Sequence, residues 1–319
     1  MKVSVLGCGR WGSFIGWYLI NNGHEVIQWG TEGNYTFDIL KNTGRNEYVE
    51  LDNRINLTPD LKFAVENSEI IIISISAQSL REFMARVVNY NIKDKKFVLC
   101  MKGIEIGTGK RLSEVVAESG VDKNNIAVWV GPGHIQAFVS GMPNCMVIDS
   151  ENKELVKLLA DNFRSNTIRF YYGDDIIGSE IGAAAKNVMG IAAGMLDGGG
   201  YTTLKGPLMA RGAREVARLI KAMGGNELSA YGLCHLGDYE TTLFSEYSHN
   251  RKFGEKFVKK EKFDKLAEGV GTAKAMKMLG EKYGVDLPIT NAVYSIIYDK
   301  KEPMQVFLDL FGRSTRKEF

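Results

Sequence analysis

The first thirty residues constrain the fold of this chain more than any other stretch. Residues 2–6 are apolar enough for a short buried strand, residues 7–12 have the sequence GCGRWG, and residues 13–21 continue as an apolar helix. In a dinucleotide-binding unit the first glycine permits the turn, the second lets the backbone approach the pyrophosphate, and the third lets the helix pack on the strand. Gly7, Gly9 and Gly12 therefore predict a cofactor loop, with a glycine-rich surface turn as the alternative.

The residues after the next strand bear on the choice of cofactor. Residues 23–29 form the expected turn and second strand, after which such sites place an acid for a free ribose hydroxyl or a base for a 2′-phosphate. Thr31 and Glu32 occupy this position. Glu32 favours NAD, but a solvated loop acid explains it equally well, so NAD and NADP both stay open. The polar stretch 31–60 is expected to be rich in turns and irregular around residues 41–53.

Further predicted strands end in small or charged residues. Continuous apolar runs predict strands at residues 69–75, 96–101 and 126–130. The carboxyl ends of parallel strands meet at one edge of the sheet, where cofactor and substrate bind. Lys102 follows the second of these strands and is a candidate anion ligand, with a solvated strand-end lysine as the alternative. Gly131 and Gly133 form a small-residue turn after the third.

The pattern of elements changes near residue 173. Strands and helices alternate up to that point, whereas no convincing strand follows it. We therefore expect an α/β fold class, with a Rossmann-type doubly wound sheet in residues 1–173 and an all-helical C-terminal domain in residues 174–319. The helices expected in the second part include residues 178–196, residues 211–223 after a turn at 205–207, and residues 268–283.

Composition narrows the function classes. The 40 basic and 38 acidic residues nearly balance, so no general field favours nucleic acid or an anionic membrane. The four cysteines are scattered without a CxxC pair, which indicates reduced thiols in the cytoplasm and no structural zinc. A metal site at Cys234, His235 and Asp238 has neither the spacing nor the ligand count of a closed site, so we expect no metal. No apolar run is long enough for a membrane span, and strand character from residue 2 speaks against a signal peptide.

The expected helix at residues 178–196 is rich in small residues and carries one lysine, Lys186. Because buried lysines are rare unless paired, we expect Lys186 to face a cleft, with outward snorkelling as the alternative. Asp238 is a candidate to hold Lys186 and tune its pKa, with a helix cap as the alternative. Residues 248–252, with the sequence SHNRK, are a donor cluster suited to a phosphate, although such a cluster alone is often a solvated turn.

Short motifs recur in a fixed order along the whole chain. They are GCGRWG at 7–12, KGIE at 102–105, GP at 131–132, GSE at 178–180, AKN at 185–187, RG at 211–212, LGD at 236–238, NRKFG at 250–254, EGV at 268–270 and LFGR at 310–313. In these residues the chain resembles the NAD(P)-dependent glycerol-3-phosphate dehydrogenases of bacteria. So many ordered matches are far more specific than any single motif.

The resemblance implies roles for individual residues. It implies that Lys186 is the catalytic acid and base, with Asp238 beside it. Together with the loop and strand-end positions above, the expected substrate contacts are Lys102, Gly131, Gly133, Asp238, Ser248, Asn250 and Arg251, and the expected cofactor contacts are Gly7, Gly9, Arg10, Trp11, Gly12, Thr31, Glu32, Lys102, His249 and Glu268.

Two departures from the family pattern concern the substrate and cofactor. Gly133 and His134 follow Gly-Pro, where the family usually has Ser and an aromatic residue. His249 stands where the family usually has an arginine that helps to hold the substrate and cofactor phosphates. Both departures bear on substrate identity and cofactor preference. Arg251, two residues further on, is a candidate to compensate.

The implied reaction is reversible hydride transfer between C4 of a nicotinamide and C2 of dihydroxyacetone phosphate, giving sn-glycerol 3-phosphate for phospholipid synthesis. The resemblance also suggests a homodimer. One alternative keeps the hydride chemistry but uses another polyol phosphate or hydroxy acid, because of Gly133, His134 and His249. A second alternative, a nicotinamide redox sensor without turnover, fits less well, because a sensor needs no proton donor such as Lys186.

Overall fold

The N-terminal half of this computed structural model, which describes residues 1–315, 317 and 318, is a sheet flanked by helices. The strands are β1 (Lys2–Leu6), β2 (Glu25–Trp29), β3 (Asn56–Thr58), β4 (Ile70–Ile73), β5 (Lys96–Leu99), β6 (Ile126–Val130), β7 (Asn144–Asp149) and β8 (Ile168–Tyr172). Within the described residues they form one eight-stranded sheet in the order β3-β2-β1-β4-β5-β6-β7-β8. All neighbours are parallel except β6 and β7. The strand order reverses between β1 and β4, which is where such sheets bind ligands.

Helices cover both faces of the sheet. They are α1 (Arg10–Asn21), α2 (Tyr35–Thr43), α3 (Leu61–Glu66), α4 (Leu80–Val87), α5 (Leu112–Glu118), α6 (Ile135–Val139) and α7 (Lys153–Phe163). Apolar side chains of α1 and α7 pack on one face, and those of α3, α4 and α5 pack on the other. Coverage on both faces explains why the central strands are continuous apolar runs; β4, for example, is four consecutive buried isoleucines.

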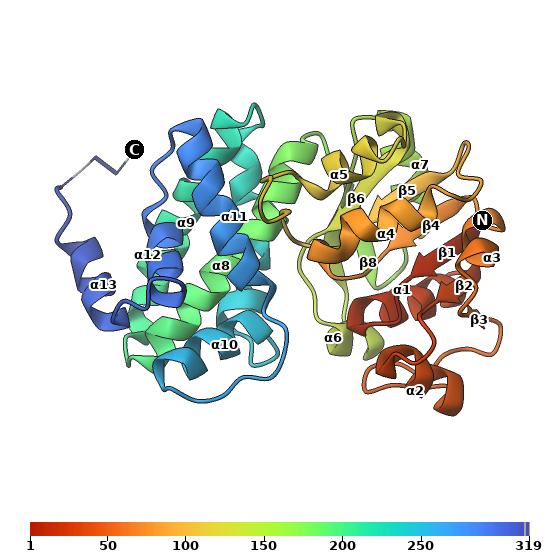
Figure 1. Cartoon of the computed structure of the whole chain (residues 1–319), viewed down its shortest axis with the longest axis horizontal. Helices are drawn as coiled ribbons and strands as arrows, with labels where there is room; N and C mark the ends of the chain where they lie inside the picture. Colours follow the sequence, from red (N-terminus) through yellow and green to blue (C-terminus); the bar gives the residue numbers. More distant parts are fainter. Residues whose placement is uncertain (316, 319) are drawn as a thin grey trace.

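The C-terminal half is built around one long helix (Figure 1). Its helices are α8 (Ile176–Gly198), α9 (Lys205–Ala222), α10 (His249–Val258), α11 (Glu268–Tyr283), α12 (Pro288–Ile297) and α13 (Pro303–Phe311), with a π-helical turn, η6, at Glu240–Phe244. α8 is buried along nearly its whole length and shares an apolar core with α9, α11 and α12. Its glycines allow close contact: a Cβ at Gly194 would lie 1.9 Å from the carbonyl oxygen of Arg251 on α10.

The sequence prediction of fold class is confirmed. The last strand ends at Tyr172 and α8 begins at Ile176, on either side of the expected boundary, and the described residues after it form helices without strands. One local prediction was incomplete and one was wrong. The stretch 31–60 has no regular helix or strand from residue 44 to residue 55, close to the irregular region expected around residues 41–53. It also contains α2, which Asn34 caps, and β3, which pairs with β2. Residues 205–207 are no turn but the first residues of α9, where proline is tolerated because first-turn amides have no partner within the helix.

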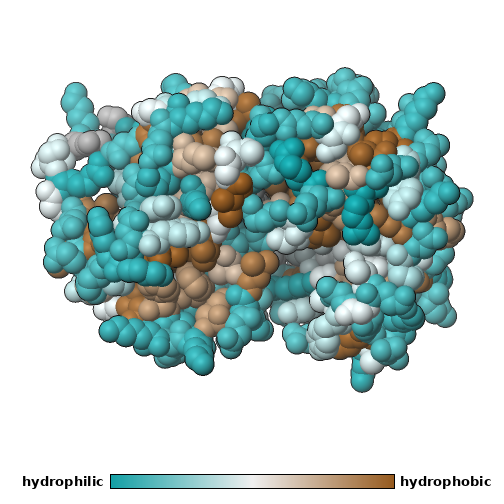
Figure 2. Space-filling view, in the orientation of Figure 1, coloured by the Kyte–Doolittle hydropathy of each residue, from teal (hydrophilic) through white to brown (hydrophobic). Residues whose placement is uncertain are grey.

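The surface is mixed and largely hydrophilic, and it is hollowed between the two halves of the molecule (Figure 2). Among the described residues, no helix combines the length and the apolar character that crossing a membrane requires.

Candidate active site

The glycine loop between β1 and α1 has the geometry of a dinucleotide site. A Cβ at Gly7, whose φ is +125°, would lie 2.2 Å from the carbonyl oxygen of Ser74, and one at Gly12 would lie 2.1 Å from that of Gly7. Gly9 faces open space, since no atom of the described residues lies within 4 Å of its Cβ position, and it precedes α1 without a side-chain cap. The N-terminal amides of α1 are therefore available to an anion, so the loop fits the pyrophosphate of a nicotinamide cofactor. Gln28 supports it by donating to the Gly7 carbonyl oxygen at 2.7 Å.

Two lysines and one aspartate meet where the sheet edge faces the helical half. Lys186, in the middle of α8, lies with its Nζ 2.8 Å from Oδ2 of Asp238. Lys102, just after β5, lies with its Nζ 2.8 Å from the same oxygen and also donates to the Gly131 carbonyl oxygen at 2.6 Å. Asp238 is 1% exposed and Lys186 8% exposed. Asp238 therefore pairs with both lysines, which favours the expected partner of Lys186 over the alternative of a helix cap.

Burial and charge set the protonation of this cluster. Burial lowers the pKa of Lys186 to about 8, with Asp238 opposing the shift and Lys102 adding to it. Burial alone would raise the pKa of Asp238, but the charges of Lys102 and Lys186 outweigh it and lower that pKa below its ordinary value. At neutral pH the cluster is thus one carboxylate shared by two ammonium groups. Lys186 has a pKa close to the physiological range, as a group that both donates and accepts a proton requires.

Hydrogen bonds from other elements fix the cluster in place. Lys186 also donates to Oγ1 of Thr242, on η6, at 2.9 Å. Asn187 donates to the carbonyl oxygen of Lys102 at 3.0 Å, and Asn250 donates to Oδ1 of Asn187 at 3.0 Å. Our sequence reasoning did not identify Thr242 or Asn187. Asn187 lies in the AKN motif, which was a usable signal, whereas nothing in the local sequence marks Thr242.

Arg10, His134 and His249 lie near the Lys186 cluster. Arg10 is the first residue of α1. Burial lowers the pKa of His134 and of His249, and the positive charge of Arg10 lowers both further, so the three groups lie near one another. Burial and the charges of Arg10, Lys186 and Lys102 lower the pKa of His134 to about 4, so its ring is neutral at physiological pH. Glu268, at the start of α11, accepts a hydrogen bond from the backbone amide of Ala77, and burial raises its pKa.

His134 and Trp11 stand out among these neighbours. The Nε2 atom of His134 is buried and has no hydrogen-bond partner within the described residues, and its ring lies 5.5 Å from that of Tyr247. Such an atom is satisfied by a ligand or by water. The ring of Trp11 packs 5.1 Å from that of Phe14 and 6.4 Å from that of Phe138, so Trp11 is held against the sheet half.

Several predicted site residues have other partners in the structure. Arg251 is ion-paired: its Nε lies 2.7 Å from Oδ2 of Asp197. In this arrangement it is not available to replace the arginine that the family usually has at the position of His249. Ser248 caps α10 by accepting from the amide of Arg251 at 3.3 Å. Gly133, with a φ of +149°, leaves no room for a Cβ, which would lie 2.3 Å from the ring of Phe138.

The two candidates for cofactor choice lie on the surface after β2. Thr31 and Glu32 are both exposed, and Glu32 Oε1 lies 2.6 Å from Nζ of Lys41 on α2. An acid and a base therefore lie side by side after β2, where the residues that read the ribose are expected from the sequence. Lys41 was not identified there from the sequence.

Two buried contacts anchor α8 to the sheet half. Glu180 accepts from Arg111 Nη1 at 2.7 Å and from the amide and hydroxyl of Ser113 at 2.9 and 2.6 Å. One residue earlier, the hydroxyl of Ser179 donates to Asp149, at the end of β7, at 2.7 Å. Because α8 carries Lys186 and the sheet carries Lys102, these contacts set the distance between the two lysines.

The Lys102, Lys186 and Asp238 cluster can transfer a proton and bind an anion. Among the described residues, no group of three or more His, Cys, Asp or Glu side chains is arranged for a metal ion. A ketone oxygen placed against Lys186 would meet an ammonium group of lowered pKa. A phosphate bound beside this cluster would meet two lysines and a single aspartate, so the net charge there is positive.

Comparisons with known proteins agree on one family. Residues 2–156 match the model of the NAD-dependent glycerol-3-phosphate dehydrogenase N-terminus, and residues 175–308 match that of its C-terminus. The chain is 34% identical over 331 residues to glycerol-3-phosphate dehydrogenase [NAD(P)+] of Prosthecochloris aestuarii, covering 100% of both, and 35% identical over 329 residues to that of a Thermotoga species, covering 100% of this chain and 99% of the other.

A solved structure gives the same result. The glycerol-3-phosphate dehydrogenase of Coxiella burnetii superposes with a TM-score of 0.88 at 26% identity, covering 98% of each chain. Both halves of the fold, the sheet with its glycine loop and the helices around α8, are thus shared over their full length. The chain belongs to the NAD-dependent glycerol-3-phosphate dehydrogenase family.

Proposed function

We propose that this chain interconverts dihydroxyacetone phosphate and sn-glycerol 3-phosphate with NAD(H) or NADP(H), and that Lys186 is its general acid and base. The observation that carries the proposal is the buried pairing of Lys186 with Asp238, together with a pKa of Lys186 near 8. Family membership supplies the substrate and the cofactor class.

Lys186 acts at the oxygen on C2 of the substrate. The bound nicotinamide supplies the hydride in reduction and accepts it in oxidation. As hydride reaches C2 of the ketone, negative charge develops on the oxygen, and the Lys186 ammonium donates a proton to give the hydroxyl. In the reverse direction neutral Lys186 takes this proton. Asp238 keeps Lys186 oriented, and Thr242 holds the same amine from a second side.

Other side chains bind and orient the substrate. Lys102 adds a second positive charge at the carboxylate of Asp238, so an anionic substrate meets both ammonium groups. Asn250, which donates to Asn187 and accepts from the amide of Gly269 at 2.9 Å, lines the same region from α10. We infer that Lys102, Gly131, Gly133, Ser248 and Asn250 contact the substrate.

The cofactor side is assigned from the loop geometry and the family. We infer that the pyrophosphate binds the loop of Gly7, Gly9 and Gly12 and the amides at the start of α1. Trp11, Arg10, His249 and Glu268 would border the remainder of the cofactor, and Thr31 and Glu32 its adenosine ribose.

Turnover is tested by following nicotinamide absorbance with dihydroxyacetone phosphate and NADH or NADPH in parallel. Lys186→Met keeps the length of the side chain and removes the amine, so we expect turnover to fall by about 10²–10⁴-fold while cofactor still binds. Lys205→Met is the matched control: it removes a second buried lysine, 2.6 Å from Asp197, and leaves Arg251 to pair with that acid. Retained turnover in Lys186→Met would remove this residue from the mechanism.

His134 motivates a second candidate within the same reaction class. Its Nε2, which has no partner among residues 1–315, 317 and 318, provides a hydrogen-bonding atom that the aromatic residue usual in the family lacks. The chain would then reduce another small polyol phosphate or a hydroxy acid precursor. A substrate panel decides: if dihydroxyacetone phosphate is used poorly and another ketone is used well, and His134→Phe reverses this order, the second candidate replaces the first.

We further propose that the protein works as a homodimer in the cytoplasm and supplies glycerol 3-phosphate for phospholipid synthesis. The family resemblance supports the dimer, and the four free cysteines fit a reducing compartment. Light scattering of the purified chain would give its mass in solution, and a monomer at micromolar concentration would contradict the dimer.

A further inference from the structure

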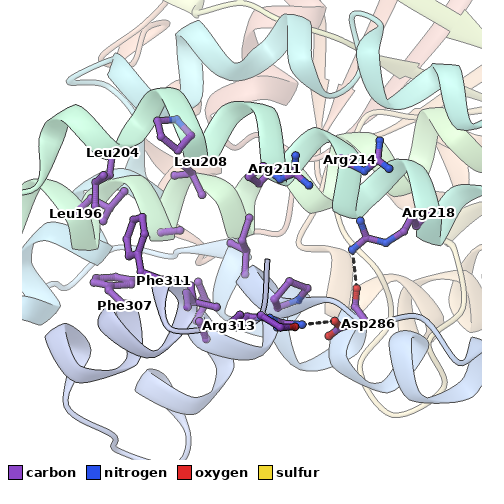
Figure 3. Close-up of a pocket in the computed structure, with 18 of the residues that line it drawn as sticks. Leu196, Leu204, Leu208, Arg211, Arg214, Arg218, Asp286, Phe307, Phe311 and Arg313 are labelled. Atoms are coloured by element: carbon purple, nitrogen blue, oxygen red, sulfur yellow. Dashed lines mark hydrogen bonds and ion pairs between the residues drawn. The ribbon is translucent and has the colours of Figure 1, made fainter. Parts of the chain in front are cut away.

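A large cavity lies in the helical half, apart from the Lys186 cluster. It has a volume of about 580 Å³ and is bounded by α8, α9, α12, α13 and the chain that follows α13 (Figure 3). This volume is in the range of small-molecule sites. Lys102, Lys186 and Asp238 do not line it.

One end of the cavity is apolar. Leu196 of α8, Leu204 just before α9, Leu208 in the first turn of α9, and Phe307 and Phe311 of α13 gather there, as Figure 3 shows. Phe311, which lines the cavity, is 63% exposed and so leaves a large apolar surface uncovered. This end suits a hydrocarbon chain.

The other end is cationic. Its lining there includes Arg211, Arg214 and Arg218 of α9 and Arg313 after α13. Figure 3 shows Arg218 and Arg313 meeting at Asp286. Within the described lining residues there are five basic side chains and two acidic ones, Asp286 and Glu318, so positive charge is in excess. Arg218 donates to the Asp286 carbonyl oxygen at 2.8 Å.

One spacing on α9 produces both ends. Leu204, Leu208, Arg211, Arg214 and Arg218 are separated by four, three, three and four residues, which places them along one face of a helix. Along this face the two leucines come first and the three arginines follow, so the same side of the helix lines both the apolar and the cationic end of the cavity.

One arginine already holds an oxyanion. Nη1 of Arg211 lies 3.0 Å from the Glu318 carboxylate, whose side chain is 66% exposed. An exposed pair of this kind contributes little to stability, so a stronger anion can replace the carboxylate. Guanidinium groups favour phosphate, because they donate two parallel hydrogen bonds to its oxygens.

We propose that this cavity binds a single-chain amphiphile that ends in a phosphate monoester. The alkyl chain lies among the leucine and phenylalanine side chains, and the phosphate replaces Glu318 on Arg211. The proposal is independent of the proposed function, because its readout is binding and not turnover.

The probe is monododecyl phosphate, titrated calorimetrically into the full chain below its critical micelle concentration. We expect saturable binding of one molecule per chain, and no binding of inorganic phosphate or of neutral dodecyl maltoside. Monodecyl phosphate should bind about 15-fold more weakly, because two methylenes fewer are buried. Equal binding of the neutral detergent, or of inorganic phosphate, would overturn the proposal.

Variants locate the site. Arg211→Gln should weaken binding about tenfold, and Lys221→Gln is its matched control, since Lys221 is on the same helix but pairs with Glu227 away from the cavity. Glu318→Gln should tighten binding, because it removes the competing carboxylate. Equal weakening by Lys221→Gln would indicate a general effect of charge and contradict the proposal.

A second pair of variants tests the apolar end and the competing occupant, a second copy of the chain. Phe311→Ser should weaken binding, whereas Leu308→Ser, also exposed on α13 but outside the cavity, should not. If monododecyl phosphate does not bind, and Phe311→Ser instead lowers self-association in light scattering, the cavity is covered by a second copy and the proposal is wrong.

Discussion

Replacing Asp238 by asparagine should move the pH dependence of catalysis downward. In the structure, Asp238 neutralises Lys186 and Lys102 at 2.8 Å each, and its charge opposes the lowering of the Lys186 pKa. In the Asp238→Asn variant the two ammonium groups lose their common counter-ion, and Lys102 continues to repel the charged form of Lys186. The pKa of Lys186 should therefore fall below its value of about 8.

The size of this shift follows from the geometry. Two unit charges about 4 Å apart interact by roughly 4 kcal/mol at an effective dielectric constant of about 20. The carboxylate is shared between two lysines, and the amide that replaces it keeps an oxygen that accepts hydrogen bonds, so only part of this energy is lost. We expect the pKa of Lys186 to fall by about 1–2 pH units, at about 1.4 kcal/mol for each.

The assay is the pH profile of kcat/KM in both directions. Reduction needs the ammonium form, so its rate should decrease as pH rises through the pKa of Lys186, near 8 in the parent chain; oxidation needs the amine and should increase there. With Asp238→Asn both transitions should move to about pH 6–7, and reduction at pH 8 should fall about 5- to 50-fold. Thr242→Val is the control, because it removes a hydrogen bond from Lys186 without a charge. Unchanged transitions in Asp238→Asn would refute this account of the cluster.

Three further changes test the loop, the anchor and the cofactor choice. Gly12→Ala should weaken NADH binding and lower the unfolding free energy by about 1–3 kcal/mol, measured by fluorescence titration and urea unfolding, because its Cβ would lie 2.1 Å from a loop carbonyl oxygen. Glu180→Ala should cost about 3–5 kcal/mol in urea unfolding, because the buried Arg111 would lose its buried partner and keep only the more exposed Glu114. Glu32→Ala should raise kcat/KM for NADPH several-fold relative to NADH, because Lys41 is freed to meet a 2′-phosphate.

The parts predicted from sequence are those with a local physical signature. The glycine loop was identified because Gly7 and Gly12 allow backbone approaches that a Cβ would block, and the structure contains both approaches. Lys186 was singled out because a lone lysine among small residues needs a partner or a cleft, and it has Asp238 as a partner. In each case the constraint lies within a few residues of chain.

Long-range partners were not accessible in this way. Thr242 contacts Lys186 across 56 residues, and Glu180 pairs with Arg111 across 69, through elements whose packing no local pattern specifies. The same reason explains why Arg251 was proposed to replace a family arginine: its pairing with Asp197, 54 residues earlier, depends on how α8 and α10 pack.

The small residues of α8 explain why the proton-transfer cluster can form in a buried position. A Cβ at Gly190 would lie 2.8 Å from Cγ2 of Thr242, so this glycine lets η6 approach the helix closely enough for Thr242 to reach Lys186. Asp238 lies in the turn just before η6, and the same approach brings it to the lysine. A larger residue at position 190 would push η6 outward, lengthen both contacts and admit water, and the pKa of Lys186 would then return toward that of a solvated lysine. The glycines of α8 therefore influence proton transfer, because they determine how well Lys186 is shielded from water.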